Sequence, residues 1–294
     1  LGDLRTQATV TADGNHFHVA ANVTLPRELT QLAQSGAEGI GLYRSEYLFV
    51  DASHPVTEAE QEAAYKQALL AQPNSRVVIR VQDLGADKLP DLASGLATGG
   101  GRGIRRLLAD PAPLRTQLRA LLKASVYGQL AIMFPFVTTV AEFQKALVIL
   151  DQEKRRLEKT GQAVADQIEV GMMVETPAAV FLADQFARYA DFFSIGSNDL
   201  GQYLFAADRQ QAGPDPDYSA LNPAMLRAIR RVITAAHAEG KWVSLCGAMA
   251  DQPVAQPLLV AMGLDEFSVP PAAILPLRQR IRQLSVRQLQ PLVQ

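Results

Sequence analysis

Eight short apolar runs, separated by longer stretches with helical periodicity, constrain the fold of this chain more than any other feature. Runs of about 4–8 apolar residues bounded by turn residues are typical of buried strands. A repeated order of strand then helix favours parallel pairing, because each helix carries the chain back to the same end of the sheet. The predicted strands are Phe17–Val23, Gly39–Tyr43, Val77–Val81, Leu130–Phe136, Ile168–Val174, Phe192–Ile195, Trp242–Leu245 and Glu266–Val269.

The segments between these runs begin as helices do. Thr57 with Glu60, and Thr139 with Glu142, have the spacing of a capping box. Three prolines come directly after a residue type that caps helices, where the missing N–H of proline costs nothing. These pairs are Asp110-Pro111, Thr176-Pro177 and Asn222-Pro223.

Two arrangements accommodate this alternation, an open doubly wound sheet and a closed barrel. Polar residues recur just after nearly every strand, and a barrel gathers the carboxyl ends of all its strands on one rim. We therefore predict an α/β fold of the (β/α)₈ TIM type. Residues 1–294 are expected to form one domain, since such barrels need about 250 residues. Asp13-Gly14 breaks an alternating run and predicts a hairpin, so residues 1–16 are interpreted as a lead-in.

Charge and composition exclude several functional classes. The net charge of −2 and the lack of a basic run argue against a nucleic-acid partner. The apolar run Leu130–Val137 is far shorter than the roughly 20 residues of a membrane span, which argues against a membrane protein. The N-terminus has no export signal, and a single cysteine, Cys246, suits a reducing compartment. We expect a soluble, cytoplasmic protein.

Arginines and carboxylates gather at the ends of the predicted strands. A guanidinium group offers paired donors that match phosphate and carboxylate oxygens, so several on one rim favour an anionic ligand. Each arginine alone is more typical of a surface ion pair. The residues at or close behind the strand ends are Arg44, Glu46, Arg80, Asp83, Asp87, Lys88, Arg102, Arg105, Glu175, Asn198, Asp199, Arg209 and Cys246.

Two of these carboxylates, Glu175 and Asp199, follow neighbouring strands. Mg²⁺ prefers oxygen ligands and is commonly shared by one or two carboxylates and substrate phosphates, so the pair predicts a magnesium site. Arginines together with a metal favour phosphoryl transfer or enolate chemistry. Glu175 is also interpretable as a carboxylate favoured by a helix N-terminus, and Cys246 as a small core residue.

Nine segments, in order along the chain, are similar to a known family: the C-terminal phosphoenolpyruvate-binding domain of enzyme I of the bacterial phosphoenolpyruvate:sugar phosphotransferase system. The resemblance runs from about Thr9 to Arg282. The segments are GAEGIGLYRSEYLF, PVTEAEQ, RVQDLGADK, GRGIR, IMFPFVTTVAEF, GMMVETPAA, DFFSIGSNDLGQYLFAADR, HAEGKWVSLCG and GLDEFSV.

This resemblance implies a Mg²⁺-assisted phosphoenolpyruvate–protein phosphotransferase that acts in the cytoplasm as a homodimer. The family transfers a phosphoryl group from phosphoenolpyruvate to a histidine on a separate N-terminal domain, and then to a small phosphocarrier protein for sugar transport, with release of pyruvate. We expect that phosphohistidine domain to be absent from this chain. In the family's pattern, Arg44, Arg80, Arg102, Asn198 and Arg209 match substrate-binding residues, Glu175 and Asp199 the metal ligands, and Cys246 the catalytic acid.

The chain departs from the pattern at three places. Ala248 stands where the family has Glu, Gly99–Gly101 replace Asn-Pro and an apolar residue before Arg102, and Gly201 stands where Thr is common. Two alternatives therefore stay open: a non-catalytic phosphoenolpyruvate sensor or dimerisation module, and a dikinase-type phosphoenolpyruvate-utilising barrel. The stretch QYLFAADR is closer to the protein phosphotransferases than to the dikinases.

Overall fold

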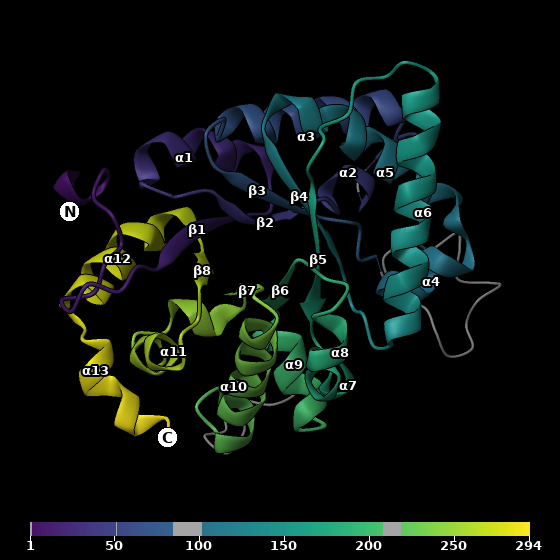
Figure 1. Ribbon diagram of the computed structural model, residues 1–294. Coiled ribbons are helices and arrows are strands. Elements are labelled where there is room, and N and C mark those ends of the chain that lie inside the picture. Colours follow the sequence, from purple (N-terminus) through teal and green to yellow (C-terminus); the bar gives the residue numbers. More distant parts are fainter. Residues whose placement is uncertain (1, 51, 85–101, 208–218) are drawn as a thin grey trace.

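The eight predicted strands pair in sequence order and close into a barrel in the computed structural model of the chain (Figure 1). All neighbours are parallel, and β1 completes the ring by pairing with β8. The structure describes residues 2–50, 52–84, 102–207 and 219–294. The (β/α)₈ barrel is therefore confirmed over the open doubly wound sheet. The strands are β1 His18–Val23, β2 Ile40–Arg44, β3 Arg76–Arg80, β4 Gln129–Phe134, β5 Glu169–Val174, β6 Phe192–Ile195, β7 Trp242–Leu245 and β8 Glu266–Val269.

At least one helix follows every strand, and the helices form a layer around the barrel (Figure 1). In the part of the chain that the structure describes, none of them has the length and apolar character needed to cross a membrane. The α-helices are α1 Leu29–Ser35, α2 Tyr47–Val50, α3 Glu58–Ala71, α4 Gly103–Ala109, α5 Pro111–Ala124, α6 Val140–Lys159, α7 Pro177–Phe181, α8 Ala183–Phe186, α9 Ser197–Leu204, α10 Pro223–Ala238, α11 Gln256–Met262, α12 Ile274–Gln283 and α13 Val286–Leu289.

Most of the predicted helix starts are confirmed by their hydrogen bonds. Thr57 accepts from the Glu60 N–H while the Glu60 carboxylate accepts from the Thr57 N–H, and the same reciprocal pair begins α6. The Thr176 and Asn222 side chains cap α7 and α10. The prediction for Asp110 was only half right: a proline does begin α5, but the Asp110 side chain makes no cap hydrogen bond.

The boundaries of β1 to β5 differ from the predictions by one or two residues. β6, β7 and β8 have the predicted bounds. Arg44, expected just beyond its strand, is instead the last residue of β2, and it lies opposite Arg80, the last residue of β3. β4 ends at Phe134, two residues earlier than predicted, because Pro135 has no N–H to donate and Phe136 adopts a left-handed backbone conformation with φ of 53°.

The core has two layers, as in other barrels of this kind. One cluster fills the barrel interior and includes Leu42, Met133, Met173 and Phe192. A second and larger cluster lies between the strands and the helices, and includes Phe134, Phe143 and Phe186 in edge-to-face contact. Because these interior side chains are buried and packed together, we look for ligand sites at the ends of the barrel.

A buried ion-pair network closes the barrel at the amino ends of the strands. The fully buried carboxylate of Glu266 accepts from Arg76 at 3.0 Å and contacts His18 Nδ1 at 2.8 Å. Burial opposes ionisation of Glu266, but these two partners hold its pKa below the ordinary value. The Arg76 guanidinium also lies 3.6 Å from the centre of the Trp242 ring. This end of the barrel is therefore held by paired charges, although among the described residues the buried Arg76 Nε has no hydrogen-bond partner.

The N-terminal lead-in is tied to the last part of the chain. An antiparallel bridge joins Val10 and His16 across a turn at Gly14, whose φ is 87°, so the predicted hairpin is confirmed. The buried Arg278 of α12 donates to Thr9 and to the carbonyl of Gly36. In Figure 1 the N-terminal segment accordingly lies beside α12.

Candidate functional site

The carboxyl ends of β2 to β7 bring most of the predicted site residues together on one rim. Arg80 and Glu175 are buried there, Arg102 and Asp199 are partly buried, and Cys246 is 5% exposed. They come from distant parts of the chain, yet strand closure places them around the barrel axis. The rim is thus a concentration of charge over an apolar barrel interior.

Arg80 is held in place and still has a donor to offer. Its guanidinium donates to Glu46 Oε1 at 2.9 Å and contacts the Met173 sulfur at 3.4 Å. The same Glu46 oxygen accepts from the Asp83 N–H at 2.8 Å. Among the residues that the structure describes, the buried Arg80 Nε has no hydrogen-bond partner. A buried donor without a partner is costly, so its position favours an anionic ligand as the partner.

Arg102 bridges two carboxylates. It donates to both oxygens of Asp83, at 3.2 and 2.9 Å, and to both oxygens of Asp199, at 3.3 and 3.0 Å. Its guanidinium also lies 4.8 Å from the centre of the Phe136 ring. Such bidentate, charge-assisted contacts fix the plane of the guanidinium as well as its position. Arg102 therefore joins the end of β3 to the first turn of α9.

Glu175 is a buried carboxylate beside other acids. It is 1% exposed, and its Oε2 accepts from the Phe136 N–H at 2.8 Å. Burial raises the pKa of Glu175 to about 8; the Arg80 cation opposes this rise, while Asp83 and Asp199 add to it through their charges and a hydrogen bond from Asp199. At neutral pH the pair Glu175 and Asp199 is therefore expected to share a proton.

This carboxylate pair fits a divalent metal ion. A cation that binds between the two carboxylates takes the place of the shared proton and relieves their repulsion. In the described ranges, no three His, Cys, Asp or Glu side chains gather into a metal-binding group. In the arrangement typical of Mg²⁺, two protein carboxylates bind the ion, and substrate oxygens and water fill the remaining coordination positions.

Cys246 lies at the end of β7 and faces the barrel interior, among Leu42, Met133 and Met173. Burial raises the pKa of its thiol above the ordinary value, against the lowering effect of the nearby Arg80 cation. The thiol contacts the Ile195 carbonyl at 3.6 Å. It therefore stays protonated at neutral pH, which is the state that an acid needs.

Asn198 and Ala248 meet where α9 approaches the end of β7. The Asn198 side-chain oxygen accepts from the Ala248 N–H at 3.2 Å. Gly247 allows this approach, since a Cβ there would lie 1.9 Å from the Ser197 hydroxyl oxygen. Ala248 itself is exposed.

The remaining predicted arginines differ in their surroundings. Arg44 is exposed at the end of β2, and its charge acts on the Cys246 thiol. Arg105 is exposed and pairs with Glu142 and Thr138, away from the other site residues. Other positions singled out in the sequence lie outside the described residues: Asp87, Lys88, Gly99–Gly101 and Arg209.

Three residues contribute to the rim in ways that sequence reasoning did not identify. Glu46 and Asp83 were noted only as polar residues at strand ends, whereas the structure makes them the anchors of Arg80 and Arg102. Asn22, the next-to-last residue of the apolar β1, is the third. A polar residue inside a run as apolar as Val19–Val23 is the signal that could have found it.

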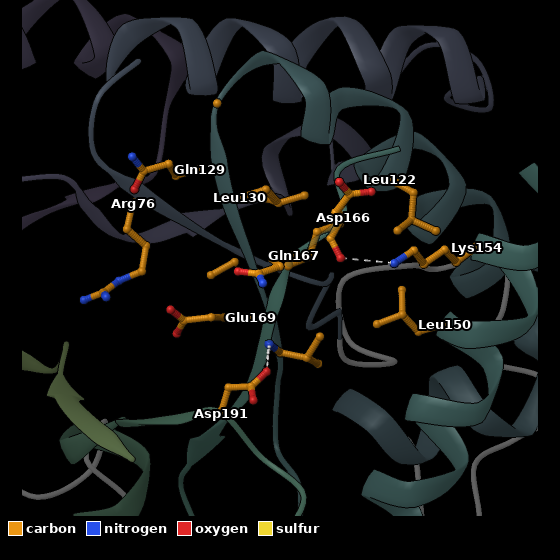
Figure 2. A pocket seen from close by; sticks show the side chains of 14 residues that line it. Arg76, Leu122, Gln129, Leu130, Leu150, Lys154, Asp166, Gln167, Glu169 and Asp191 are labelled. Atoms are coloured by element: carbon orange, nitrogen blue, oxygen red, sulfur yellow. Dashed lines mark hydrogen bonds between the residues drawn. The ribbon is translucent and has the colours of Figure 1, made fainter. Parts of the chain in front are cut away.

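A cavity of about 590 Å³ lies at the other end of the barrel and does not contain the predicted site. Figure 2 shows its lining around the starts of β3, β4 and β5, with Arg76, Gln129 and Glu169 on one side and Lys154 and Asp166 on the other. None of the predicted site residues that the structure describes lines it. We therefore place the candidate site at the carboxyl ends of the strands, where function in such barrels resides.

The chain is similar to known proteins over nearly its whole length. A phosphoenolpyruvate–protein phosphotransferase of Bacillus sp. (strain S) is 52% identical over 283 residues, which are 95% of this chain and 49% of that protein. Proteins of the same name are 49% identical over 96% of this chain in Bacillus subtilis (strain 168) and 47% over 99% in Staphylococcus carnosus (strain TM300). The chain spans about half the length of these relatives.

Solved structures with low identity share the fold alone. A citrate lyase from Burkholderia xenovorans LB400 aligns with a TM-score of 0.58 at 16% identity, over 94% of this chain and 81% of the other. A HpcH/HpaI aldolase/citrate lyase family protein from Burkholderia cenocepacia J2315 aligns with a TM-score of 0.57 at 15% identity, over 99% of both chains.

Residues 1–286 match the family described as the phosphoenolpyruvate-binding domain of phosphoenolpyruvate-utilising enzymes, and the chain belongs to that family.

Proposed function

We propose that this chain is the phosphoenolpyruvate-binding catalytic domain of a phosphoenolpyruvate–protein phosphotransferase. The observation that carries the proposal is the rim itself. It has a buried carboxylate, Glu175, beside a second carboxylate, a buried arginine with an unused Nε–H, and a protonated thiol over the barrel interior. These groups match the phosphate, the carboxylate and the enol carbon of phosphoenolpyruvate. The names of the relatives support the same activity.

In this proposal the arginines bind the substrate. Arg80 directs its Nε–H at an anionic oxygen while Glu46 prevents the guanidinium from turning away. Arg44 and Arg102 add positive charge on either side, and Asn198 orients the substrate through its side-chain amide. Arg209 is proposed as a further ligand on the family's pattern alone.

Glu175 and Asp199 are proposed to hold Mg²⁺. When bound, the metal ion supplies charge neutralisation at the phosphoryl oxygens. The two carboxylates otherwise repel an anionic substrate, so their role depends on a cation between them. The hydrogen bond from Phe136 N–H keeps Glu175 oriented.

The proposed reaction breaks the P–O bond of phosphoenolpyruvate and forms a P–N bond to a histidine on a separate domain. The leaving group is the enolate of pyruvate. The Cys246 thiol then gives its proton to the terminal carbon of the enolate, which yields pyruvate and a thiolate that regains a proton from water. Protonation at carbon makes the transfer strongly favourable, so the acid has to lie close to that carbon.

The phosphohistidine domain, a small phosphocarrier protein and a second copy of this chain are the proposed partners. We propose that the chain acts in the cytoplasm, within a sugar phosphotransferase system, as a homodimer. Sedimentation at micromolar concentration tests the last point, and a monomer there counts against it.

The test of function combines the chain with phosphoenolpyruvate, Mg²⁺ and the separately produced phosphohistidine domain of a relative. We expect one equivalent of pyruvate and one phosphohistidine for each acceptor domain. Binding of phosphoenolpyruvate without pyruvate release would favour a sensor module instead. Failure to bind phosphoenolpyruvate at all, measured by calorimetry with Mg²⁺ present, would overturn the proposal.

A further inference from the structure

Asn22 connects three strands at the rim of the barrel. Its side-chain N–H₂ group donates to the carbonyl of Cys246 at 3.1 Å and to the carbonyl of Ser268 at 3.1 Å. Its side-chain oxygen accepts from the Ser268 hydroxyl. Because an asparagine amide has two N–H donors, both are used on backbone carbonyls and neither is left for a ligand. Asn22 is thus a fixed element and not a substrate contact.

The contact with Cys246 is the unusual one, since the two residues are on strands that do not pair. β1 pairs with β8 and β2, whereas Cys246 follows β7. The last paired residue of β7 on its β8 side is Leu245, so the sheet supplies no β8 partner for the Cys246 carbonyl. Asn22 reaches over β8 and provides a donor at that position.

The backbone of Cys246 is therefore held on both sides. Its N–H donates to the Ile195 carbonyl of β6 at 3.1 Å, and its carbonyl accepts from Asn22 of β1. The next residue, Gly247, packs so closely on Ser197 that no side chain fits between them. Because the peptide groups on both sides of the Cys246 Cα are fixed, the direction of its Cα–Cβ bond is fixed as well.

We propose that Asn22 is a positioning residue for the Cys246 thiol. It holds the Cys246 carbonyl, and through it the Cα–Cβ bond, so that the thiol faces the barrel axis where the enolate carbon is protonated. The assignment rests on the proposed function, in which Cys246 is the acid. Ser268 acts with Asn22 by fixing the orientation of its amide.

The role predicts a specific kinetic consequence. In the proposed function phosphoenolpyruvate binds through the arginines, none of which Asn22 contacts, so its affinity stays unchanged in a variant. Protonation depends on the position of the thiol, and a displacement of about 1 Å can lower a rate by up to roughly a hundredfold. A loss of kcat without a change in KM for phosphoenolpyruvate is expected.

The first experiment measures thiol reactivity and needs no partner domain. Because Cys246 is the single cysteine of the chain, alkylation by iodoacetamide, followed by mass, reports on this thiol alone. In Asn22→Ala we expect the folded chain to be alkylated about fivefold faster or more, the factor that corresponds to one lost hydrogen bond. Asn22→Leu removes the same hydrogen bonds but keeps the side-chain volume. It replaces Asn22→Ala in this experiment if the alanine variant does not fold.

The matched control is Asn222→Ala. Asn222 also uses its side chain on backbone, because its side-chain oxygen accepts from the Ala224 N–H and caps α10. Loss of this cap destabilises the folded chain, so faster alkylation caused by a general loosening of the chain would show here too. We expect its alkylation rate to stay close to wild type.

The second experiment measures pyruvate release with the phosphohistidine domain added, at varied phosphoenolpyruvate. We expect Asn22→Leu to lower kcat about tenfold or more with KM unchanged. Alkylation and kcat that both equal wild type would overturn the positioning role. Wild type that releases no pyruvate would overturn the proposed function instead, while the alkylation result would still decide whether Asn22 positions the thiol.

Discussion

Arg102 Nη2 lies 3.0 Å from Asp199 Oδ2 and 2.9 Å from Asp83 Oδ2, so one guanidinium neutralises two carboxylates on the rim. Asp199 is also one of the two carboxylates proposed to hold Mg²⁺. Arg102 and the metal ion therefore compete for the same oxygens, and an incoming phosphate offers the guanidinium an alternative partner. This relationship makes metal binding and substrate binding depend on each other.

Removing Arg102 should strengthen the binding of Mg²⁺ alone. In Arg102→Gln we expect Mg²⁺ to bind about fivefold tighter or more, because charge-assisted contacts worth roughly 1–2 kcal/mol no longer compete for Asp199. Calorimetric titration with Mg²⁺ in the absence of phosphoenolpyruvate measures this. Arg105→Gln, which disturbs only Glu142 and Thr138, is the control, and equal affinities in all three proteins would separate Arg102 from the metal site.

Phosphoenolpyruvate should bind weakly without a divalent ion. Glu175 and Asp199 share a proton without a cation and keep a net negative charge that opposes the substrate's carboxylate and phosphate, so we expect at least about a tenfold loss of affinity when Mg²⁺ is omitted. The measurement is titration of phosphoenolpyruvate with Mg²⁺ and with a chelator. The same affinity in both conditions would remove the metal from the proposed function.

Arg80 and Arg105 should differ sharply when each is replaced by alanine. Arg80 is buried and charge-paired, and the loss of such a contact to a ligand costs about 2–5 kcal/mol, which abolishes measurable phosphoenolpyruvate binding. Arg105 is exposed, and its pair with Glu142 is worth well under about 1 kcal/mol. Both variants need a thermal melt beside the titration. Similar losses of affinity in two folded variants would mean that the arginines are misassigned.

Replacing the Cys246 thiol should separate binding from turnover. Cys246→Ser is expected to bind phosphoenolpyruvate normally but to release pyruvate far more slowly, because a hydroxyl is a much weaker acid than a thiol. Ala248→Glu restores the residue type of the family next to the thiol and is expected to raise turnover. Pyruvate release with the phosphohistidine domain in trans measures both. A serine variant as fast as wild type would make Cys246 a core residue only.

The pair of His18 and the buried Glu266 should make stability depend on pH. Burial disfavours the charged imidazole, but the hydrogen bond and charge of Glu266 outweigh it and raise the pKa of His18 above 6.5. The folded chain therefore binds this proton more tightly than the unfolded chain. The resulting stabilisation is complete below the unfolded pKa and is lost as the pH rises through the higher folded pKa.

Urea unfolding of His18→Gln at about pH 5.5 and about pH 9 tests this dependence. We expect the variant to lose roughly 0.5–1 kcal/mol more at the lower pH, a modest figure because His18 is 35% exposed. His54→Gln disrupts an exposed pair with Glu60 and should show little difference between the two conditions. A loss in His18→Gln that is the same at both pH values would mean that the pair is not charged in the folded chain.

Local sequence was sufficient to predict the fold and most of the helix starts. Capping residues such as Thr57 and Thr139 act on the backbone three residues ahead, and short apolar runs define strands such as β6, whose bounds were predicted correctly. Such signals depend on neighbours along the chain. The sequence also placed Arg80, Glu175 and Cys246 at strand ends, because their positions follow directly from those of the strands.

Barrel closure alone decided which side chains the rim residues contact. Arg102 meets Asp199 from 97 positions away, and Asn22 meets Cys246 from 224 positions away. No local pattern encodes such pairs, since they depend on which strand ends lie across the axis from one another. The high pKa of Glu175 has the same origin: burial and the neighbouring acids that cause it exist only once the strands have closed. The sequence by itself determined which chemical groups reach the rim, and the tertiary structure decided which of them touch.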